Sequence, residues 1–393
     1  MGRIVGKAQY RDILLGAGLL WATLALVLWP EQAMGAMRDG LKLCGNVIIP
    51  SLFPFFVLSS LVVELGMTRY LGRLLEPVMA PLFRVNGCCA AALALGFVGG
   101  YPVGARTAIQ IYENGQCSRT EAERMLAFCN NSGPAFILGV VGAGVFGSGG
   151  LGLLLYLAHL LASLFVGVLF RFYKPGDRPR TRRIQGPQFQ TASFSKAFTS
   201  SITGALQSTL NICAFVLFFT VFLRILAYAG ILTSIAGFLS ALLTPLGMDQ
   251  TWAERLLTGL VEVSSGVSSL TDGTLSGRLS MAAFMLGWAG VSVHCQVLAF
   301  LGDSSLPAGT YVLGKLLHGA FSAALAALLF HFIPISSPAS FYLAEQTEAI
   351  ANLDFHRALT LSASAAWGMW LVFLALTVYM VQKNSGKGRR NIV

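Results

Sequence analysis

The polar residues of this sequence that could bind a solute gather at four breaks in otherwise apolar segments. The breaks lie at residues 99–104, 130–134, 262–266 and 287–292. Backbone N–H and C=O groups cannot stay unpaired in lipid, so a segment broken by glycine and proline must be buried in protein or line a wet cavity. The N-termini of half-helices suit an anion, and free carbonyls suit a cation. The breaks therefore predict a binding site, although their glycines could instead serve only close helix packing.

Short polar side chains at the breaks are the candidate ligands of this solute. Such groups can replace the water shell of a polar molecule, but they also form hydrogen bonds between helices. His294 could bind substrate, relay protons or simply pack. The candidates are Gly100, Tyr101 and Pro102 in the break at 99–104, Asn130, Asn131 and Ser132 in the break at 130–134, Ser264 and Ser265 in the break at 262–266, and Ser292, His294 and Gln296 in or just after the break at 287–292.

Three ionisable residues inside apolar segments extend this set. Glu262 lies far from either end of its segment, where an ionised carboxylate is costly to bury, so we expect it to bind a proton or Na⁺ or to pair with a cation. Arg106 and Lys315 are candidate partners for Glu262 and candidate ligands for an acidic substrate. Arg106 could instead extend to the membrane interface. His159 stays outside the predicted site because its sequence neighbours are apolar.

The composition requires a membrane for these segments. Of the 393 residues, 55% are hydrophobic and 11% are charged, against about 25% charged residues in soluble domains. Apolar runs of roughly 18 to 28 residues are long enough to cross a bilayer. The net charge of +10 comes from basic residues in short loops and tails, where it reports orientation rather than nucleic-acid binding. The seven cysteines form no C-x-x-C pair, so we expect buried thiols and no metal site.

A basic linker decides the topology. Residues 171–196 carry seven basic side chains and a single acid, so this linker belongs in the cytoplasm. It would lie outside if every apolar segment crossed the membrane. Two segments are therefore expected to enter and leave on one side, as re-entrant hairpins. The solution is an all-α protein with eight transmembrane helices, two hairpins and cytoplasmic termini.

The two halves of the chain then form inverted repeats, which are typical of secondary transporters with a site near the midplane. Asn46 and Asn211 open the two halves, and Leu52-Phe53 matches Leu217-Phe218. The expected organisation is a tail and first span (1–40), a first repeat (41–172) with an interfacial helix (67–85), a hairpin (88–112) and a broken helix (125–147), a linker (173–200), a second repeat (201–333) with a hairpin (252–275) and a broken helix (279–301), and an external segment, last span and basic tail (334–393).

An enzyme is not expected. Ser132-Gly133 with a distant His294 superficially suggests an intramembrane serine protease, but Asn130 stands where such proteases carry glycine. The sequence has no paired intramembrane aspartates, no H-E-x-x-H motif and no P-loop. ATP-driven transport by this chain alone is therefore not expected either.

Five runs of sequence resemble the YlbJ-type sporulation integral membrane proteins. They are Asn46–Phe55, Leu75–Phe83, Gly99–Ala105, Asn130–Pro134 and Gly287–His294. That family belongs to the nucleoside-recognition or "gate" domain group, which is similar in plan to the concentrative nucleoside transporters. The resemblance implies a spore-forming bacterium, a role in sporulation, and movement of dipicolinate, a small aromatic dicarboxylate, toward the forespore.

One difference separates this chain from the nucleoside transporters. They carry Gly-Gln-Thr-Glu in the first hairpin, whereas the comparable residues here are Gly100-Tyr101-Pro102-Val103, with no acid or amide. We therefore expect a secondary transporter of a small anionic or aromatic metabolite, with dipicolinate implied by the resemblance. The alternatives are a nucleoside or nucleobase transporter and a non-transporting scaffold of a sporulation complex.

The expected partners are a small-molecule substrate and the lipid bilayer, with no nucleic acid, no cofactor, and coupling to H⁺ or Na⁺. A homo-oligomer is left open. The expected location is a bacterial inner membrane, either that of the mother cell or the outer forespore membrane.

Overall fold

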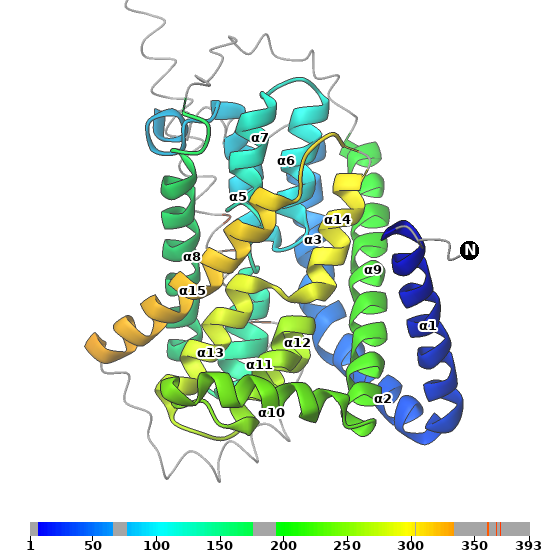
Figure 1. Cartoon of the computed structure of the whole chain (residues 1–393). Coiled ribbons are helices and arrows are strands. Elements are labelled where there is room, and N and C mark those ends of the chain that lie inside the picture. Colours follow the sequence, from blue (N-terminus) through cyan, green and yellow to red (C-terminus); the bar gives the residue numbers. More distant parts are fainter. Residues whose placement is uncertain are drawn as a thin grey trace, which may run out of the picture.

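The computed structural model describes residues 7–65, 77–175, 194–302 and 304–333, together with Thr360, Trp367 and Trp370. Within these residues the chain forms helices and short connections, with no strand (Figure 1). The all-α prediction is confirmed. The predicted external segment and last span (334–393) lie outside the described residues, apart from the three isolated ones.

A long helical arm leads into the first repeat and forms its first element. Helix α1 (Lys7–Leu28) turns by 94° into α2 (Pro30–Leu43), which continues through a π-helical turn η1 (Cys44–Ile48) into α3 (Ile49–Glu64). Helix α3 contains Pro50 and Pro54 and continues through both. Pro50 follows the wide turn η1 and lies in the first turn of α3, so the local geometry adapts to its missing N–H.

The first repeat contains the predicted hairpin and broken helix. After a helical stretch at residues 77–83 and the turn η2 (Gly87–Cys89), helices α5 (Ala90–Gly99) and α6 (Val103–Glu113) lie side by side. Helix α7 (Arg119–Leu126) is separated from η3 (Ala135–Val145) by a non-helical stretch, and α8 (Gly149–Phe170) completes the repeat. The broken helix begins earlier than predicted because a capping box of Ser118 and Glu121 starts α7. Residues 67–76 of the predicted interfacial helix lie outside the described residues.

The second repeat follows the same plan. Helix α9 (Phe194–Tyr228) leads to α10 (Ile231–Leu243) and the short turn η4 (Thr244–Leu246). The hairpin consists of α11 (Gln250–Val261) and α12 (Val263–Ser268), and the broken helix of α13 (Leu275–Trp288) and α14 (Gly290–Gly302). The break is a single residue, Ala289, with φ of 80°. Helix α15 (Gly309–Phe332) packs against α8 and α13.

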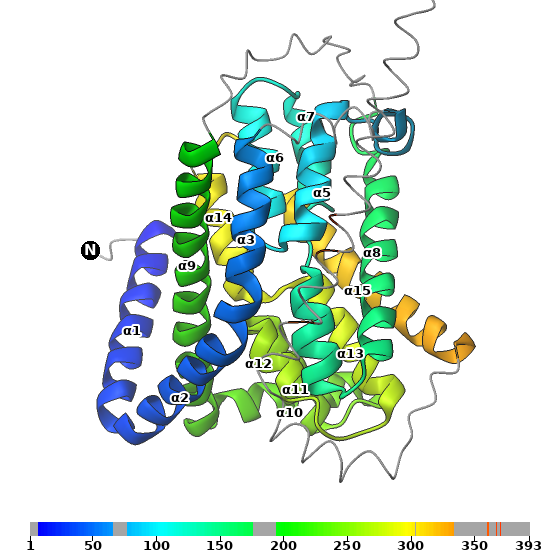
Figure 2. The ribbon, with the colours of Figure 1, turned by 180° about the vertical axis from the view of Figure 1, so that it is seen from behind.

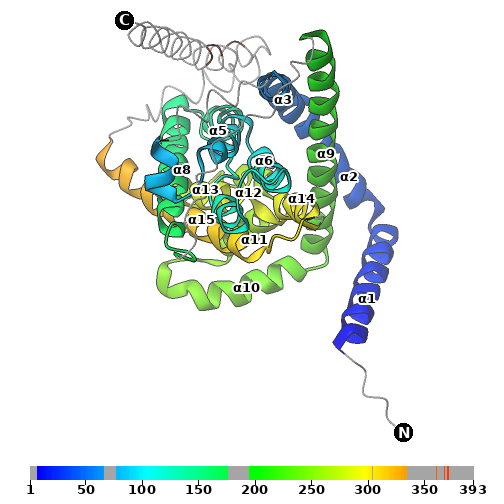
Figure 3. The ribbon, with the colours of Figure 1, turned by 90° about the horizontal axis from the view of Figure 1, so that it is seen from above.

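The two hairpins enter from opposite ends of the molecule (Figures 1 and 2). Hairpin α5–α6 opens toward the end where α7 begins, and hairpin α11–α12 opens toward the end where α10 lies. Helix α10 lies crosswise to the bundle at this end, as an interfacial helix would (Figure 1), and runs along one side of the bundle when it is seen from above (Figure 3). The inverted arrangement is therefore confirmed.

By length and composition, four helices among the described residues could cross a membrane, or up to six if each bent pair is one span. One of those bent pairs joins residues 77–83 to 87–99 and thus leads into the hairpin. The predicted count of eight spans stays a prediction.

Candidate functional site

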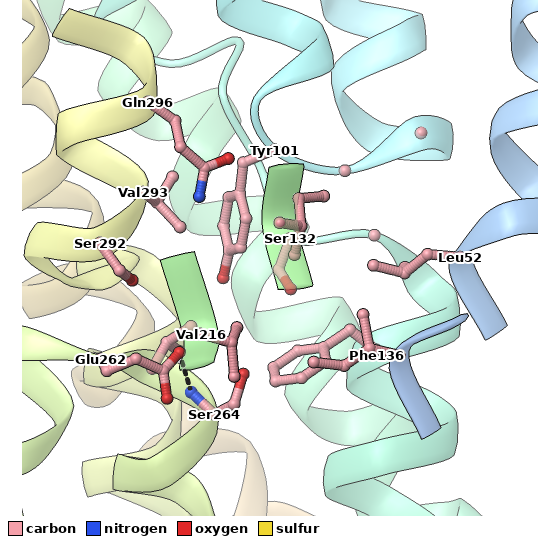
Figure 4. A pocket seen from close by; sticks show the side chains of 16 residues that line it. Leu52, Tyr101, Ser132, Phe136, Val216, Glu262, Ser264, Ser292, Val293 and Gln296 are labelled. Carbon is pink, nitrogen blue, oxygen red and sulfur yellow. Dashed lines mark hydrogen bonds between the residues drawn. The ribbon is translucent and has the colours of Figure 1, made fainter. Parts of the chain in front are cut away.

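A cavity lies where the two hairpin tips meet the two broken helices, as the sequence predicts (Figure 4). It is lined at the break between α7 and η3 (residues 127–134, called the first break below) and by α14, which follows the break at Ala289 (called the second break below). It has about 50 Å³ of room for the centres of water-sized molecules, against roughly 10–15 Å³ for one water. The cavity is therefore large enough to hold several waters or a small polar group. Its lining residues are Ile48, Leu52, Gly99, Gly100, Tyr101, Ser132, Gly133, Phe136, Ile212, Val216, Glu262, Val263, Ser264, Ser292, Val293 and Gln296.

Half of the predicted site residues line this cavity. They are Gly100, Tyr101, Ser132, Glu262, Ser264, Ser292 and Gln296. The apolar wall from α3 and α9 was not predicted as part of the site. The matching runs around Leu52 and Leu217 carried a signal for it, because equivalent elements of inverted repeats tend to flank a shared site.

The first hairpin tip contacts the first break through backbone. Gly100 has φ of 74°, and a Cβ atom on it would lie 2.9 Å from the Gly133 nitrogen, so only glycine fits this approach. The Tyr101 hydroxyl donates to the carbonyl of Leu286, at 3.5 Å, on the other broken helix. The tip thereby contacts both repeats. Pro102, next to Tyr101, does not line the cavity.

Glu262 forms the tip of the second hairpin and is 1% exposed. Its carboxylate accepts hydrogen bonds from the N–H groups of Ser264, at 3.0 Å, and Ser265, at 2.6 Å. It therefore caps α12 from within the cavity wall. Among the described residues, neither Arg106 nor Lys315 forms an ion pair with it, so the predicted pairing is not formed.

Arg106 lies outside the cavity. Its side chain is exposed on α6, and its guanidinium lies 5.7 Å from the ring centroid of Phe300. This placement matches the alternative of an arginine that extends to the surface.

Lys315 is fully buried next to the first break. Its ammonium group donates to the carbonyl of Asn130, at 2.8 Å, contacts His318 Nδ1, at 3.3 Å, and lies 5.7 Å from the centroid of the Tyr101 ring. The Asn130 side chain donates to the Tyr311 hydroxyl, at 3.3 Å, which in turn contacts His294 Nδ1, at 2.9 Å. Lys315, Asn130 and His294 thus belong to one network behind the cavity wall.

Helix α8 holds the same break from another side. The Ser132 N–H donates to His159 Nε2, at 3.0 Å, and Ser163 Oγ donates to the carbonyl of Phe128, at 2.7 Å. The Asn131 amide donates to that carbonyl too, at 2.9 Å. His159 was left out of the site because its sequence neighbours are apolar. Its polar partners come from elements distant in sequence.

His318 and Tyr311 were also not predicted. Together with Lys315 and Ser322 they recur on α15 at intervals of three and four residues, so they share one face of the helix. That polar stripe within an apolar helix was the signal available in the sequence. All four residues are buried.

Several buried polar atoms around the first break have no hydrogen-bond partner in the structure. They include the Oδ1 atoms of Asn130 and Asn131, Ser132 Oγ, and His294 Nε2. Buried polar groups are normally paired with protein, water or ligand, so these atoms suit a wet or solute-binding environment. Among the described residues there is no group of three or more histidine, cysteine, aspartate or glutamate side chains that could hold a metal ion.

Two oppositely directed hairpins and two broken helices around a central cavity define a gate-type transporter fold. Residues 47–151 match the Gate family model, described as nucleoside recognition. CNTnw, a concentrative nucleoside transporter, has a similar structure in an outward-facing state, with a TM-score of 0.52 at 13% identity, covering 84% of this chain and 88% of that one. In an intermediate state the TM-score is 0.53 at 15% identity, covering 84% and 89%. At these identities the likeness shows the fold alone.

A curated relative shows the family. The sporulation integral membrane protein YlbJ of Bacillus subtilis (strain 168) is 32% identical over 340 residues, which cover 82% of this chain and 83% of the relative. The chain belongs to the YlbJ family of sporulation integral membrane proteins.

Proposed function

We propose that this chain is a secondary transporter that moves a small anionic or aromatic metabolite during sporulation by alternating access. The observation that carries the proposal is the cavity between two oppositely directed hairpin tips and two helix breaks. Motion of either hairpin would open the cavity toward one end of the molecule while the other hairpin keeps it closed. This is the physical requirement for alternating access in inverted-repeat transporters.

Dipicolinate is the proposed substrate, because its features suit the groups around the cavity. Tyr101 and Phe136 offer ring faces to an aromatic substrate in the lining. Glu262 is the only acid among the described residues of the lining. It already accepts two backbone N–H groups, so part of its charge is compensated. Gln296 and Ser292 could donate to carboxylate oxygens.

A nucleoside or nucleobase is the second candidate. The match of residues 47–151 to a nucleoside-recognition model favours it, as does the fold. The first hairpin tip, Gly100-Tyr101-Pro102, offers no side-chain amide or acid for a base or ribose, and this favours the first candidate.

The test is uptake by vesicles that contain the purified full chain. Labelled dipicolinate and labelled nucleosides are compared, and Gln296→Leu is the site variant. Gln110→Leu is the matched control, because Gln110 is exposed on α6. We expect dipicolinate uptake that Gln296→Leu abolishes and Gln110→Leu preserves. Uptake of nucleosides alone would identify a nucleoside as the substrate in place of dipicolinate. Uptake of neither compound would favour the non-transporting scaffold of a sporulation complex.

The proposed orientation places the basic linker (173–200) and both termini on the cytoplasmic side of a bacterial inner membrane. Reporter fusions at the N-terminus and after Phe332 provide a test. A periplasmic signal at the N-terminus would overturn this orientation, and a cytoplasmic signal after Phe332 would do so too.

A further inference from the structure

Helix α15 carries a stripe of ionisable and polar side chains through the apolar interior. Tyr311, Lys315, His318 and Ser322 are each 0% exposed. The α15 side chains contact the first break, α8 and α14. Ionisable groups inside membrane segments are costly and usually serve ion or proton pathways. The stripe lies behind the cavity wall, so direct binding of the solute does not explain it.

Hydrogen-bond directions fix how the two bases of this stripe share hydrogens. A carbonyl oxygen only accepts, so His318 Nε2, 2.9 Å from the His159 carbonyl, carries a hydrogen. In the neutral ring Nδ1 is then an acceptor, and Lys315 Nζ donates to it across 3.3 Å. Two donors cannot face each other across this contact. The Lys315–His318 pair therefore accommodates one excess proton and not two.

Within the described part of the chain, the pair has no acidic partner that would fix its charge. Among the described residues no carboxylate lies within ion-pair distance of Lys315, and Glu262 is bonded to the N-terminus of α12. A buried charge without a counter-ion is destabilising. A proton on this pair is therefore free to leave when the surroundings change.

Other titratable groups also face Lys315, and none of them is a carboxylate. They are His318 and Tyr311 on α15, His159 on α8, Cys129 at the end of α7, His294 on α14, and Tyr101 at the first hairpin tip. His159 Nε2 accepts from the Ser132 N–H and so bears no hydrogen. That bond is incompatible with a doubly protonated His159 ring.

The charge on this pair acts on the wall of the cavity. Lys315 holds the carbonyl of Asn130, and His318 holds the carbonyl of His159, whose ring holds Ser132. Ser132 lines the cavity. Hydrogen bonds from an ammonium group are roughly twice as strong as those from a neutral amine. Loss of the proton would therefore weaken the hold on the first break at the point where it meets the solute.

We propose that the coupling ion of this transporter is a proton and that the Lys315–His318 pair on α15 carries it, rather than Glu262. The inference rests on the transport function proposed above. A proton binds the pair when the cavity is open to one side and leaves when it is open to the other. The strength of the Lys315 bond to Asn130 links this event to the geometry of the first break.

The transport test separates coupling from solute binding. Vesicles with the full chain are assayed for dipicolinate exchange without a gradient and for uptake driven by an imposed pH gradient. His318→Gln keeps a donor for the His159 carbonyl and an acceptor for Lys315 but cannot bind a proton. Lys315→Met removes the base at similar length. His331→Gln is the matched control, because His331 is exposed at the far end of α15.

The expected result is that both pair variants keep exchange but take up no more solute with a pH gradient than without one. His331→Gln should behave like wild type. The proposal is overturned if His318→Gln retains gradient-driven uptake, or if only Glu262→Gln abolishes it. It is also overturned if wild-type uptake depends on a Na⁺ gradient and not on a pH gradient. In that case the proposed transport function is still supported.

A second measurement needs no solute. Nitrogen NMR of ¹⁵N-histidine in the full chain in lipid reports which ring nitrogens carry hydrogen, and His318→Gln assigns one signal. We expect His318 as the Nε2–H form, with a change in its Nδ1 signal on pH titration that Lys315→Met alters. A signal independent of pH and of Lys315 would overturn the proton site, whichever solute the protein transports.

Discussion

Both hairpins contain glycines that allow close packing, but the neighbouring atoms differ between the two hairpins. In the first, Gly96 of α5 and Gly104 of α6 both bring their Cα atoms against the backbone carbonyl of Cys129 at the first break. In the second, Gly266 of α12 packs against the backbone of Gly259 of α11, and the flexible side chain of Met285 covers Gly259. The first hairpin is thus held backbone to backbone, and the second is held partly through a side chain that can adjust.

The two helix breaks differ in the same way as the hairpins, because the first break is held by more contacts than the second. The first spans residues 127–134 and is held by Lys315, His159 and Ser163. The second is a single residue, and the Trp288 indole donates to the carbonyl of Leu260, at 3.0 Å, on the second hairpin. Since the second hairpin depends on fewer rigid contacts, we expect it to move first, while the first hairpin stays with the scaffold of α8 and α15.

The largest expected effect comes from filling the close approach in the first hairpin. In Gly104→Ala the new methyl group would collide with the Cys129 carbonyl and Gly96, both of them backbone. Overpacking costs about 1–3 kcal/mol and occasionally more, and we expect the upper end or beyond. Thermal unfolding of the purified protein measures the loss.

Gly259→Ala sharpens this comparison. Its methyl group would lie 2.5 Å from Met285 side-chain atoms, which can rotate away, so we expect a smaller decrease in melting temperature. Gly139→Ala is the control, because no atom lies within 4 Å of the position of its Cβ. Equal decreases in melting temperature for Gly104→Ala and Gly259→Ala would show that the two hairpins are equally rigid.

The second prediction concerns the cap of the second hairpin, which has no counterpart in the first. Glu262→Ala leaves the N–H groups of Ser264 and Ser265 without their acceptor. An unsatisfied buried group costs about 1–3 kcal/mol, so we expect lower stability and faster hydrogen exchange in α12. Glu262→Gln keeps an acceptor oxygen and should lose less than about 1 kcal/mol. Equal losses in both variants would mean that the charge itself holds the tip.

The sequence was sufficient to predict the breaks, the re-entrant hairpins and their inversion. The side of the membrane on which the basic linker must lie, together with the number of crossings, and the positions of the glycines can be read from the sequence alone. Neither depends on which helix faces meet. The sequence did not predict that His159 would join Ser132, or that Glu262 would bond to its own hairpin rather than to Lys315. Both depend on which helix faces meet, and helical periodicity alone does not specify this for segments that are apolar all round.

The third prediction concerns the open end of the first repeat, outside the candidate spans. Burial raises the pKa of Glu123, but hydrogen bonds from Lys174, Tyr173 and Arg119 outweigh this, so its pKa is lowered overall. A lowered carboxyl pKa adds stability above the unfolded pKa of about 4.3, and this stability is lost as pH falls through the folded value. Glu123→Gln should thus lower the melting temperature near pH 7, by less than Glu262→Ala does.

The melting temperatures of wild type and Glu123→Gln should begin to approach each other below the unfolded pKa and converge only as the pH falls through the lowered folded pKa of Glu123, where the wild-type carboxyl becomes protonated. Melting curves at a series of pH values provide the measurement. A difference that persists unchanged into acid would show that Glu123 acts through packing and not through its charge.

The smallest expected effect lies at the open end of the second hairpin. Arg255 donates to the backbone carbonyl of Asp272, at 2.6 Å, and only weakly approaches its carboxylate, at 3.4 Å. The Asp272 side chain is 85% exposed, and exposed ion pairs contribute about 0–1 kcal/mol. Asp272→Asn keeps the bond to the carbonyl, so the melting temperature should change little at low or high salt. Arg255→Met removes that bond and the contact with the Trp252 ring, and it should destabilise the protein more. If Asp272→Asn were instead as damaging as Glu123→Gln, a surface charge would hold the second hairpin as firmly as the buried carboxylate holds the first repeat, and the expected order of motion would lose its basis.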